Sequence, residues 1–228
     1  LVGWHRQRRA WPAGGWPAPT EPAVALFSVP DPAAFEGGPG SSWNDTLLPQ
    51  LDRWLSGLGY RVIRFCAPES RGVEQALARR ARDVRPLILY TTVRGLWRSA
   101  CAWWAPRWPE RLCVAGRPAD WLFRREWWLD AARSGWCVFR HYHECLSTML
   151  ARGSWRWVVF FFENQPWEKL SVLAARRHGV PAAAVQMALL SRYYLSYFLG
   201  RDDARRMPLP DAVCVSGPGI ARLLVEGG

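Results

Sequence analysis

Apolar residues along this chain group into short runs that alternate with stretches of helical spacing. From residue 23 onward the runs have the length of buried strands, and they occupy residues 23–29, 60–66, 86–93, 155–162, 181–187 and 211–216. Helical patterns follow several of these runs, at residues 41–58, 72–82, 166–178 and from 218 onward. Strands that alternate with helices predict right-handed crossovers. We therefore expect an α/β fold with a doubly wound, mostly parallel, Rossmann-like sheet.

Functional residues are expected where the predicted strands end, because open parallel sheets bind ligands beyond the carboxyl ends of their strands. The sharpest pattern is FFFENQPWEK at residues 160–169. Pro166 suits the first position of a helix, and Asn164 stands just ahead of the unpaired amides of that helix. Glu163 thereby comes to the rim of the predicted cleft. A carboxylate there could act as a general base toward a sugar hydroxyl, or hold an acceptor by hydrogen bonds.

The two acidic residues of this pattern have different alternatives. Glu168 could stand at the cleft rim, or it could simply complement the positive end of the helix dipole. Glu163 ends an all-apolar strand, where an acid has no evident structural duty, and this favours a functional role for Glu163.

The stretch FFENQPWEKLSVLAARRHG resembles the FENxPWE block of bacterial surface-carbohydrate biosynthesis proteins, which are assigned as GT-B-type glycosyltransferases. The resemblance covers about residues 155–228 in order and spacing, and extends more loosely upstream. Its further blocks are AVQ at 184–186, Ser191, residues 195–199, PLPD at 208–211 and VSG at 215–217. The sequence departs from the family at Met187, where relatives place His, so any role of that His is missing here.

This resemblance implies that residues 23–228 form the acceptor-side domain of a glycosyltransferase that uses a glycan acceptor. A second Rossmann-like domain would hold the nucleotide-sugar donor, and no permanently bound cofactor is expected. Glu163 is the expected catalytic residue. The residues expected to bind substrate are Asn164, Gln165, Glu168, Gln186, Ser191 and Gly217. Since the sequence lacks an initiator Met and ends in a helical pattern, we expect it to belong to a longer protein.

Two further patterns have ordinary structural explanations. SGPG at residues 216–219 suggests a phosphate-binding turn, but the third glycine of GxGxxG would fall at Arg222, so a tight strand-to-helix turn accounts for it better. His141, His143 and Cys145 alternate along the chain; on a strand all three would share a face, and on a helix only His141 and Cys145 would. No second ligand cluster accompanies them, and no metal site is expected.

The composition adds a strong positive charge and an unusual aromatic segment. The formal net charge is +11, and only Lys169 of the 30 basic residues is a lysine. Residues 1–22 lack periodicity and are predicted to form a flexible arm. Residues 94–136 hold eight Trp and eight Arg against four acidic residues, and are predicted to form two or three short helices. These indoles could contact an anionic membrane surface, or rings such as Trp97, Trp121 and Trp128 could fill the core between helices.

Other functions remain alternatives to sugar transfer. A basic, aromatic surface could bind a polyanion, although the arginines are spread over the whole chain and no nucleic-acid motif is present, so nucleic acid is not an expected partner. A GT-B-like sugar epimerase or polyol-phosphate transferase is the third possibility. The six cysteines show no CxxC pair or regular spacing, which indicates reduced thiols and a cytoplasmic protein, in contact with the inner face of the plasma membrane if the indoles bind lipid.

Overall fold

The structure is a computed structural model, and it describes residues 18–28, 50–66, 84–102, 113–114, 117–118, 121, 124–125, 128–129, 135–163, 165–186 and 207–227. Its centre is a parallel sheet of six strands in the order β3-β2-β1-β6-β7-β8. The strands are β1 (Ala23–Ser28), β2 (Arg61–Cys66), β3 (Val84–Pro86), β6 (Trp155–Phe162), β7 (Ala182–Gln186) and β8 (Ala212–Cys214). The predicted doubly wound, Rossmann-like α/β sheet is confirmed.

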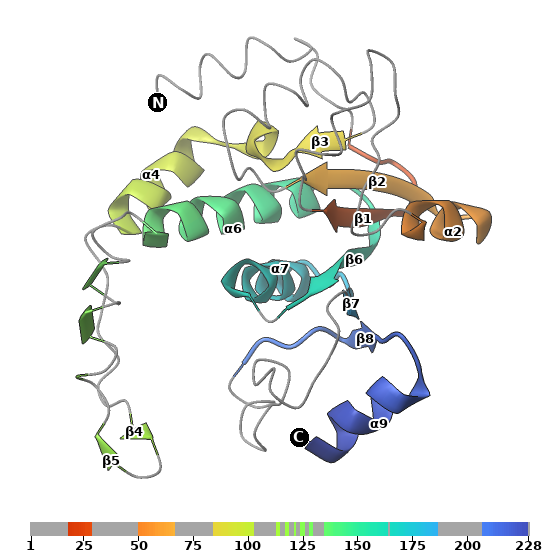
Figure 1. The fold of residues 1–228 in the computed structure, drawn as a ribbon. Helices are drawn as coiled ribbons and strands as arrows, with labels where there is room; N and C mark the ends of the chain where they lie inside the picture. The colour runs from red at the N-terminus through yellow and green to blue at the C-terminus, as the bar shows by residue number, and fades with distance from the viewer. Residues whose placement is uncertain are drawn as a thin grey trace, which may run out of the picture.

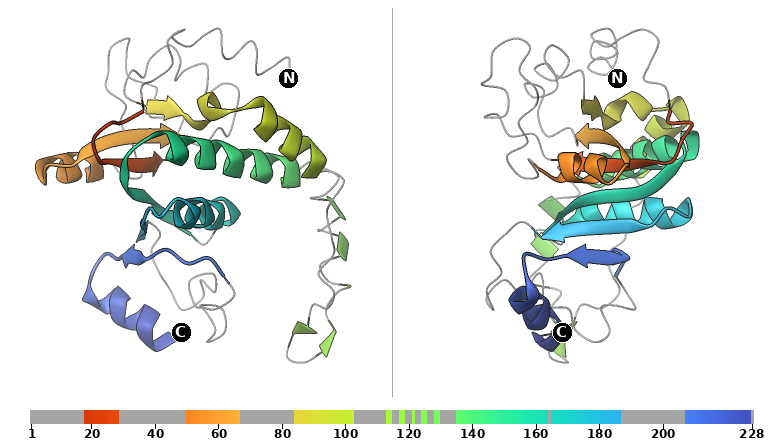
Figure 2. Two further views of the ribbon diagram at one scale, coloured as in Figure 1. Left: turned by 180° about the vertical axis from the view of Figure 1, so that it is seen from behind. Right: turned by 90° about the vertical axis from the view of Figure 1, so that its right-hand side faces the viewer.

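Helices lie on both faces of this sheet (Figures 1 and 2). The helical elements are α2 (Leu51–Gly57), the 3-10 helix η2 (Leu87–Tyr90), α4 (Val93–Cys101), α6 (Gly135–Arg152), α7 (Pro166–Arg177) and α9 (Pro218–Gly227). α6 and α7 pack on one face, and α2 packs on the other. A small antiparallel pair, β4 (Cys113–Val114) and β5 (Arg117–Pro118), lies apart from the sheet.

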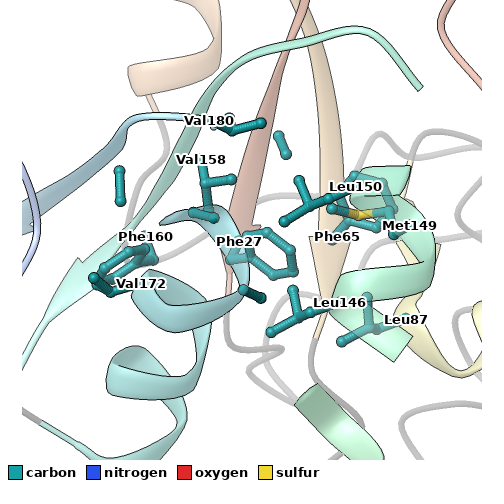
Figure 3. Close-up of a cluster of buried hydrophobic side chains, with 14 of the residues drawn as sticks. Phe27, Phe65, Leu87, Leu146, Met149, Leu150, Val158, Phe160, Val172 and Val180 are labelled. Carbon is teal, nitrogen blue, oxygen red and sulfur yellow. The ribbon is translucent and has the colours of Figure 1, made fainter. Parts of the chain in front are cut away.

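The main core fills the space between the sheet and the helices α6 and α7 (Figure 3). The rings of Phe27 and Phe65 stack with their centroids 5.3 Å apart, and Phe160 continues this aromatic layer across β6. Leu146 and Met149 of α6 are fully buried against these rings. Strand residues alternate between the two faces, and both faces of the central strands carry apolar side chains, as expected for a sheet covered on both sides.

The third strand was predicted wrongly. Residues 86–93 read as one apolar strand, but β3 ends at Pro86, and residues 87–90 form η2. Proline has no N–H for a ladder, which restricts it to strand ends and edge strands, and β3 is an edge strand that ends at Pro86. Thr92 then caps α4, because its hydroxyl accepts a hydrogen bond of 2.9 Å from Gly95 N–H.

Other sequence-based predictions differ less. No element was predicted at the position of α6, although its buried residues recur at helical spacing. Within the predicted flexible arm, Pro19 is buried, and its carbonyl accepts a hydrogen bond of 2.9 Å from Ser154 N–H. The end of that segment is therefore fixed to the sheet, while residues 1–17 lie outside the described residues. The predicted helix at 72–82 and the first part of that at 41–58 also lie outside them.

Candidate active site

The strand order places a topological switch point between β1 and β6. From β1 the chain continues outward through β2 and β3, whereas β6, β7 and β8 extend the sheet in the opposite direction. In open parallel sheets the crevice at such a point, beyond the carboxyl ends of the strands, is the usual ligand site. Ser28 ends β1 and Glu163 directly follows β6, so both lie at this edge of the sheet.

Glu163 is held in place by a buried carboxylate. Its backbone N–H donates a hydrogen bond of 3.0 Å to Oε1 of Glu168, whose side chain is only 2% exposed. α7 begins at Pro166, and the preceding Gln165 has an extended backbone and makes no side-chain cap. Glu168 therefore reaches back from the first turn of the helix, as the acidic member of a capping box does. This bond fixes the direction in which the chain leaves β6.

A polar pair lies behind Glu168 in the interior. The hydroxyl of Tyr142 lies 3.3 Å from the hydroxyl of Ser171, which itself donates to the carbonyl of Trp167 over 3.0 Å. Burial raises the pKa of Tyr142 well above its usual value; the hydrogen bond with Ser171 opposes this shift, and the nearby Glu168 adds to it. The phenol is therefore neutral, and it is confined by its neighbours rather than presented to a ligand.

The indole of Trp167 closes the interior side of this region. Its ring centroid lies 4.9 Å from that of Phe161, 5.9 Å from that of Phe160 and 6.3 Å from that of Tyr142. The PWE part of the sequence pattern thus has a local explanation. Proline begins the helix, tryptophan packs onto β6, and glutamate binds the backbone beyond it.

Gln186 joins the ends of β7 and β8. It pairs with Phe162 in the sheet register and is nearly buried. Its Oε1 accepts hydrogen bonds from Ser216, 3.3 Å from the backbone N and 3.4 Å from the hydroxyl. Gly217 follows with φ of +151°, a conformation that favours glycine. These contacts support the interpretation of SGPG as a tight turn.

Five of the seven residues predicted for the site fall at one edge of the sheet. Glu163, Gln165 and Glu168 follow β6, Gln186 ends β7, and Gly217 follows β8. The predicted placement of Glu163 and Gly217 at the same edge is confirmed, because all the strands are parallel. The strands that precede them, β6 and β8, are two strand spacings apart, roughly 10 Å. Asn164 and Ser191 lie outside the described residues.

Sequence reasoning missed one residue at the switch point. Ser28 is 2% exposed, and its hydroxyl has no hydrogen-bond partner within the part of the chain that the structure describes. A buried hydroxyl without a partner is costly, which makes Ser28 a candidate ligand contact beside Glu163. Its position next to the end of the predicted first strand, residues 23–29, was the only sequence signal available.

The histidine–cysteine pattern lies on α6, so only His141 and Cys145 share a face. Thr91 Oγ1 lies 3.1 Å from His141 Nε2 and 3.4 Å from Cys145 Sγ, and the two α6 side chains are 3.6 Å apart. Burial raises the pKa of Cys145 to about 11, which leaves it a protonated thiol rather than a nucleophile. Among the described residues no group of three or more His, Cys, Asp or Glu side chains could hold a metal ion.

His178 directly follows α7, where a cation would complement the negative end of the helix dipole. Burial, and then the charge of Arg177, lower its pKa, so the neutral imidazole is favoured instead.

The interpretation of the Trp-rich segment as core is wrong for three of its rings. Trp97, Trp121 and Trp128 are 70%, 73% and 58% exposed. Trp103, Trp104, Trp108 and Trp127 lie outside the described residues. No helix within the described ranges is long and apolar enough to cross a membrane.

Comparisons with models of protein families, with characterised proteins and with solved structures found no match to this chain.

Proposed function

We propose that this chain is the acceptor-side domain of a GT-B-type glycosyltransferase, with Glu163 as the general base that deprotonates the acceptor hydroxyl. The observation that carries the proposal is the position of Glu163 at the switch-point edge, with its backbone fixed by the buried Glu168. The resemblance of the FENxPWE block to surface-carbohydrate biosynthesis proteins supports the same function.

The different surroundings of the two carboxylates support a division of roles. Glu168 is buried and satisfies a backbone amide, which is a structural duty. Glu163 is only half-buried, and its position beyond the strand leaves it accessible to an acceptor. A nucleotide-sugar would bind to a second Rossmann-like domain facing this edge, and the attacking hydroxyl would lie between the two. A lipid-linked acceptor would place the reaction at the inner face of the plasma membrane.

The test is glycosyl transfer by the complete gene product, with a panel of nucleotide-sugars and lipid-linked or free glycan acceptors. Glu163→Gln should keep the folded structure and donor affinity and lose about two to four orders of magnitude in transfer rate, the usual contribution of a general base. Glu21→Gln is the matched control, since Glu21 is exposed just before β1, at the opposite edge of the sheet. The control should retain full activity.

Two results would contradict this assignment. Full activity of Glu163→Gln would reduce Glu163 to a structural residue. Nucleotide-sugar that is consumed without transfer to any acceptor, and converted instead to an isomeric sugar, would favour the epimerase alternative.

A further inference from the structure

Helix α4 presents its apolar side to solvent. Val93 and Trp97 are 80% and 70% exposed, and Cys101, one further turn along, is also exposed. These positions recur every four residues and therefore form one stripe along the helix. The buried positions are the small residues Gly95 and Ser99. A surface helix normally buries its apolar stripe, so the orientation of α4 is the reverse of the usual one.

The reversal is fixed by the way α4 packs on α6. A Cβ atom at Gly95 would lie 3.2 Å from Cβ of Glu144, so the two helices approach closely at this glycine. The hydroxyl of Ser99 bonds to the carbonyl of Gly95 over 2.7 Å and needs no partner outside the helix. Turning α4 over would bring the indole of Trp97 into a contact that has room only for a glycine. The exposed stripe is thus a consequence of the packing.

The first turns of α6 expose further apolar side chains. Trp136, Val138 and Phe139 in its first turns are all exposed. Arg98 in the last turn of α4 and Arg140 near the beginning of α6 both lie against Glu144, at 3.4 Å and 2.7 Å. The end of α4 therefore lies beside the beginning of α6, as Figures 1 and 2 show. We call the exposed residues Val93, Trp97, Cys101, Trp136, Val138 and Phe139 the α4–α6 apolar surface.

The charged side chains around this surface carry a net positive charge. Arg94 is exposed next to Val93, and Arg98 and Arg140 share a single carboxylate, that of Glu144. These four side chains together leave a net charge of two positive units. Farther along the chain the described part also exposes Arg124 and Arg125, near Trp121 and Trp128. Indole rings favour the headgroup level of a bilayer, and arginines beside them bind anionic lipid headgroups.

We propose that the α4–α6 apolar surface binds the face of a membrane that contains anionic lipid. The combination of indole, phenyl and aliphatic groups with arginines matches an anionic lipid interface, whereas a second copy of the chain would bring the same positive charges together. The inference deepens the proposed function, since it rests on that function for the role of a lipid-linked acceptor. Its test uses lipid alone, so its failure is distinguishable from failure of the transfer reaction.

The experiment is co-sedimentation of the protein with vesicles of phosphatidylcholine, with and without phosphatidylglycerol. The wild-type protein should bind the anionic vesicles, and binding should weaken as salt is added. Trp97→Ser and Phe139→Ser should each weaken binding by about tenfold, because each removes one apolar side chain from the interface. Arg94→Gln should weaken binding about fivefold, the effect expected for one arginine near an anionic surface.

Trp54→Ser is the matched control, since Trp54 is a similarly exposed indole on α2, on the other face of the sheet. It should bind the vesicles as the wild-type protein does. All four positions are partly or fully exposed, so circular dichroism and urea midpoints should be unchanged. The proposal is overturned if the wild-type protein does not sediment with anionic vesicles, if Trp97→Ser binds as well as Trp54→Ser, or if Trp97→Ser instead dissociates a dimer in light scattering.

Discussion

Oε1 of Glu168 lies 3.0 Å from the backbone nitrogen of Glu163 and accepts its hydrogen bond. Glu168 lies five residues after Glu163 in the sequence. Its buried carboxylate holds the backbone of Glu163, whose own carboxylate is accessible. The position of Glu163 depends on this bond, because Gln165, which precedes the helix, contributes no side-chain cap.

Glu168→Gln should destabilise the protein by about 1–3 kcal/mol, the range for leaving a buried donor such as the Glu163 N–H without a good partner. This is more than the few tenths of a kcal/mol expected from the helix dipole alone. Urea denaturation provides the measurement, and Glu163→Gln provides the comparison, with an expected change within about 0.5 kcal/mol. Equal, small changes in the two variants would show that the bond contributes little.

Gly153→Ala should destabilise the link between α6 and β6. An added Cβ atom would lie 2.7 Å from Cδ of Pro19 and 2.8 Å from Nε1 of Trp155, and neither ring can swing away as the end of a flexible side chain can. We expect a loss of about 1–3 kcal/mol, the usual cost of overpacking. Gly57→Ala is the control, since its Cβ would meet no atom within 4 Å, and it should be neutral or stabilising by up to about 1 kcal/mol. Thermal unfolding of both variants would compare them directly.

Stability should fall as the pH decreases below about 6.5. Burial is the largest cause that lowers the pKa values of His141 and His143, so each takes up its proton more readily in the unfolded chain. Between the folded and unfolded pKa values the unfolded state binds more protons, and each histidine costs at most about 1.4 kcal/mol per pH unit there. Above the unfolded-state pKa these histidines are neutral in both states, so the stability that they help to set is fully present there. His141→Asn should reduce the slope of urea midpoints between roughly pH 7.5 and 5.5. An unchanged slope would exclude His141 as a source.

The sequence was sufficient for the sheet because buried parallel strands carry a continuous apolar signal. The strands predicted at residues 155–162 and 23–29 agree with β6 and β1 to within one residue. Gly59 and Gly179 follow the ends of α2 and α7 and have positive φ. The run at 86–93 failed because apolar composition alone does not separate a strand from a 3-10 turn, and the capping hydroxyl of Thr92 was not recognised.

The site was less accessible to sequence reasoning than the fold. The edge that gathers Glu163, Gln186 and Gly217 follows from strand order, and it could be anticipated. The bond from Glu168 to the backbone of Glu163 could not, since a glutamate in the first turn of a helix is usually exposed. The exposure of the apolar side of α4 could not be predicted either, because it depends on a close contact of Gly95 with α6, which begins forty residues later.

The central position of β1 has a consequence for the order of folding. Val24 pairs with Val62 on one side and with Trp157 on the other, and the second pairing closes a much longer stretch of chain. The loop-closure free energy of the longer connection is about 1 kcal/mol less favourable, and the contacts that offset it form only afterwards. Contacts of high sequence separation also slow folding. We therefore expect β1, β2 and β3 to associate as one unit and β6, β7 and β8 as another. The edge at which Ser28 and Glu163 lie on neighbouring strands would then come into being only in the final step, when the two units join.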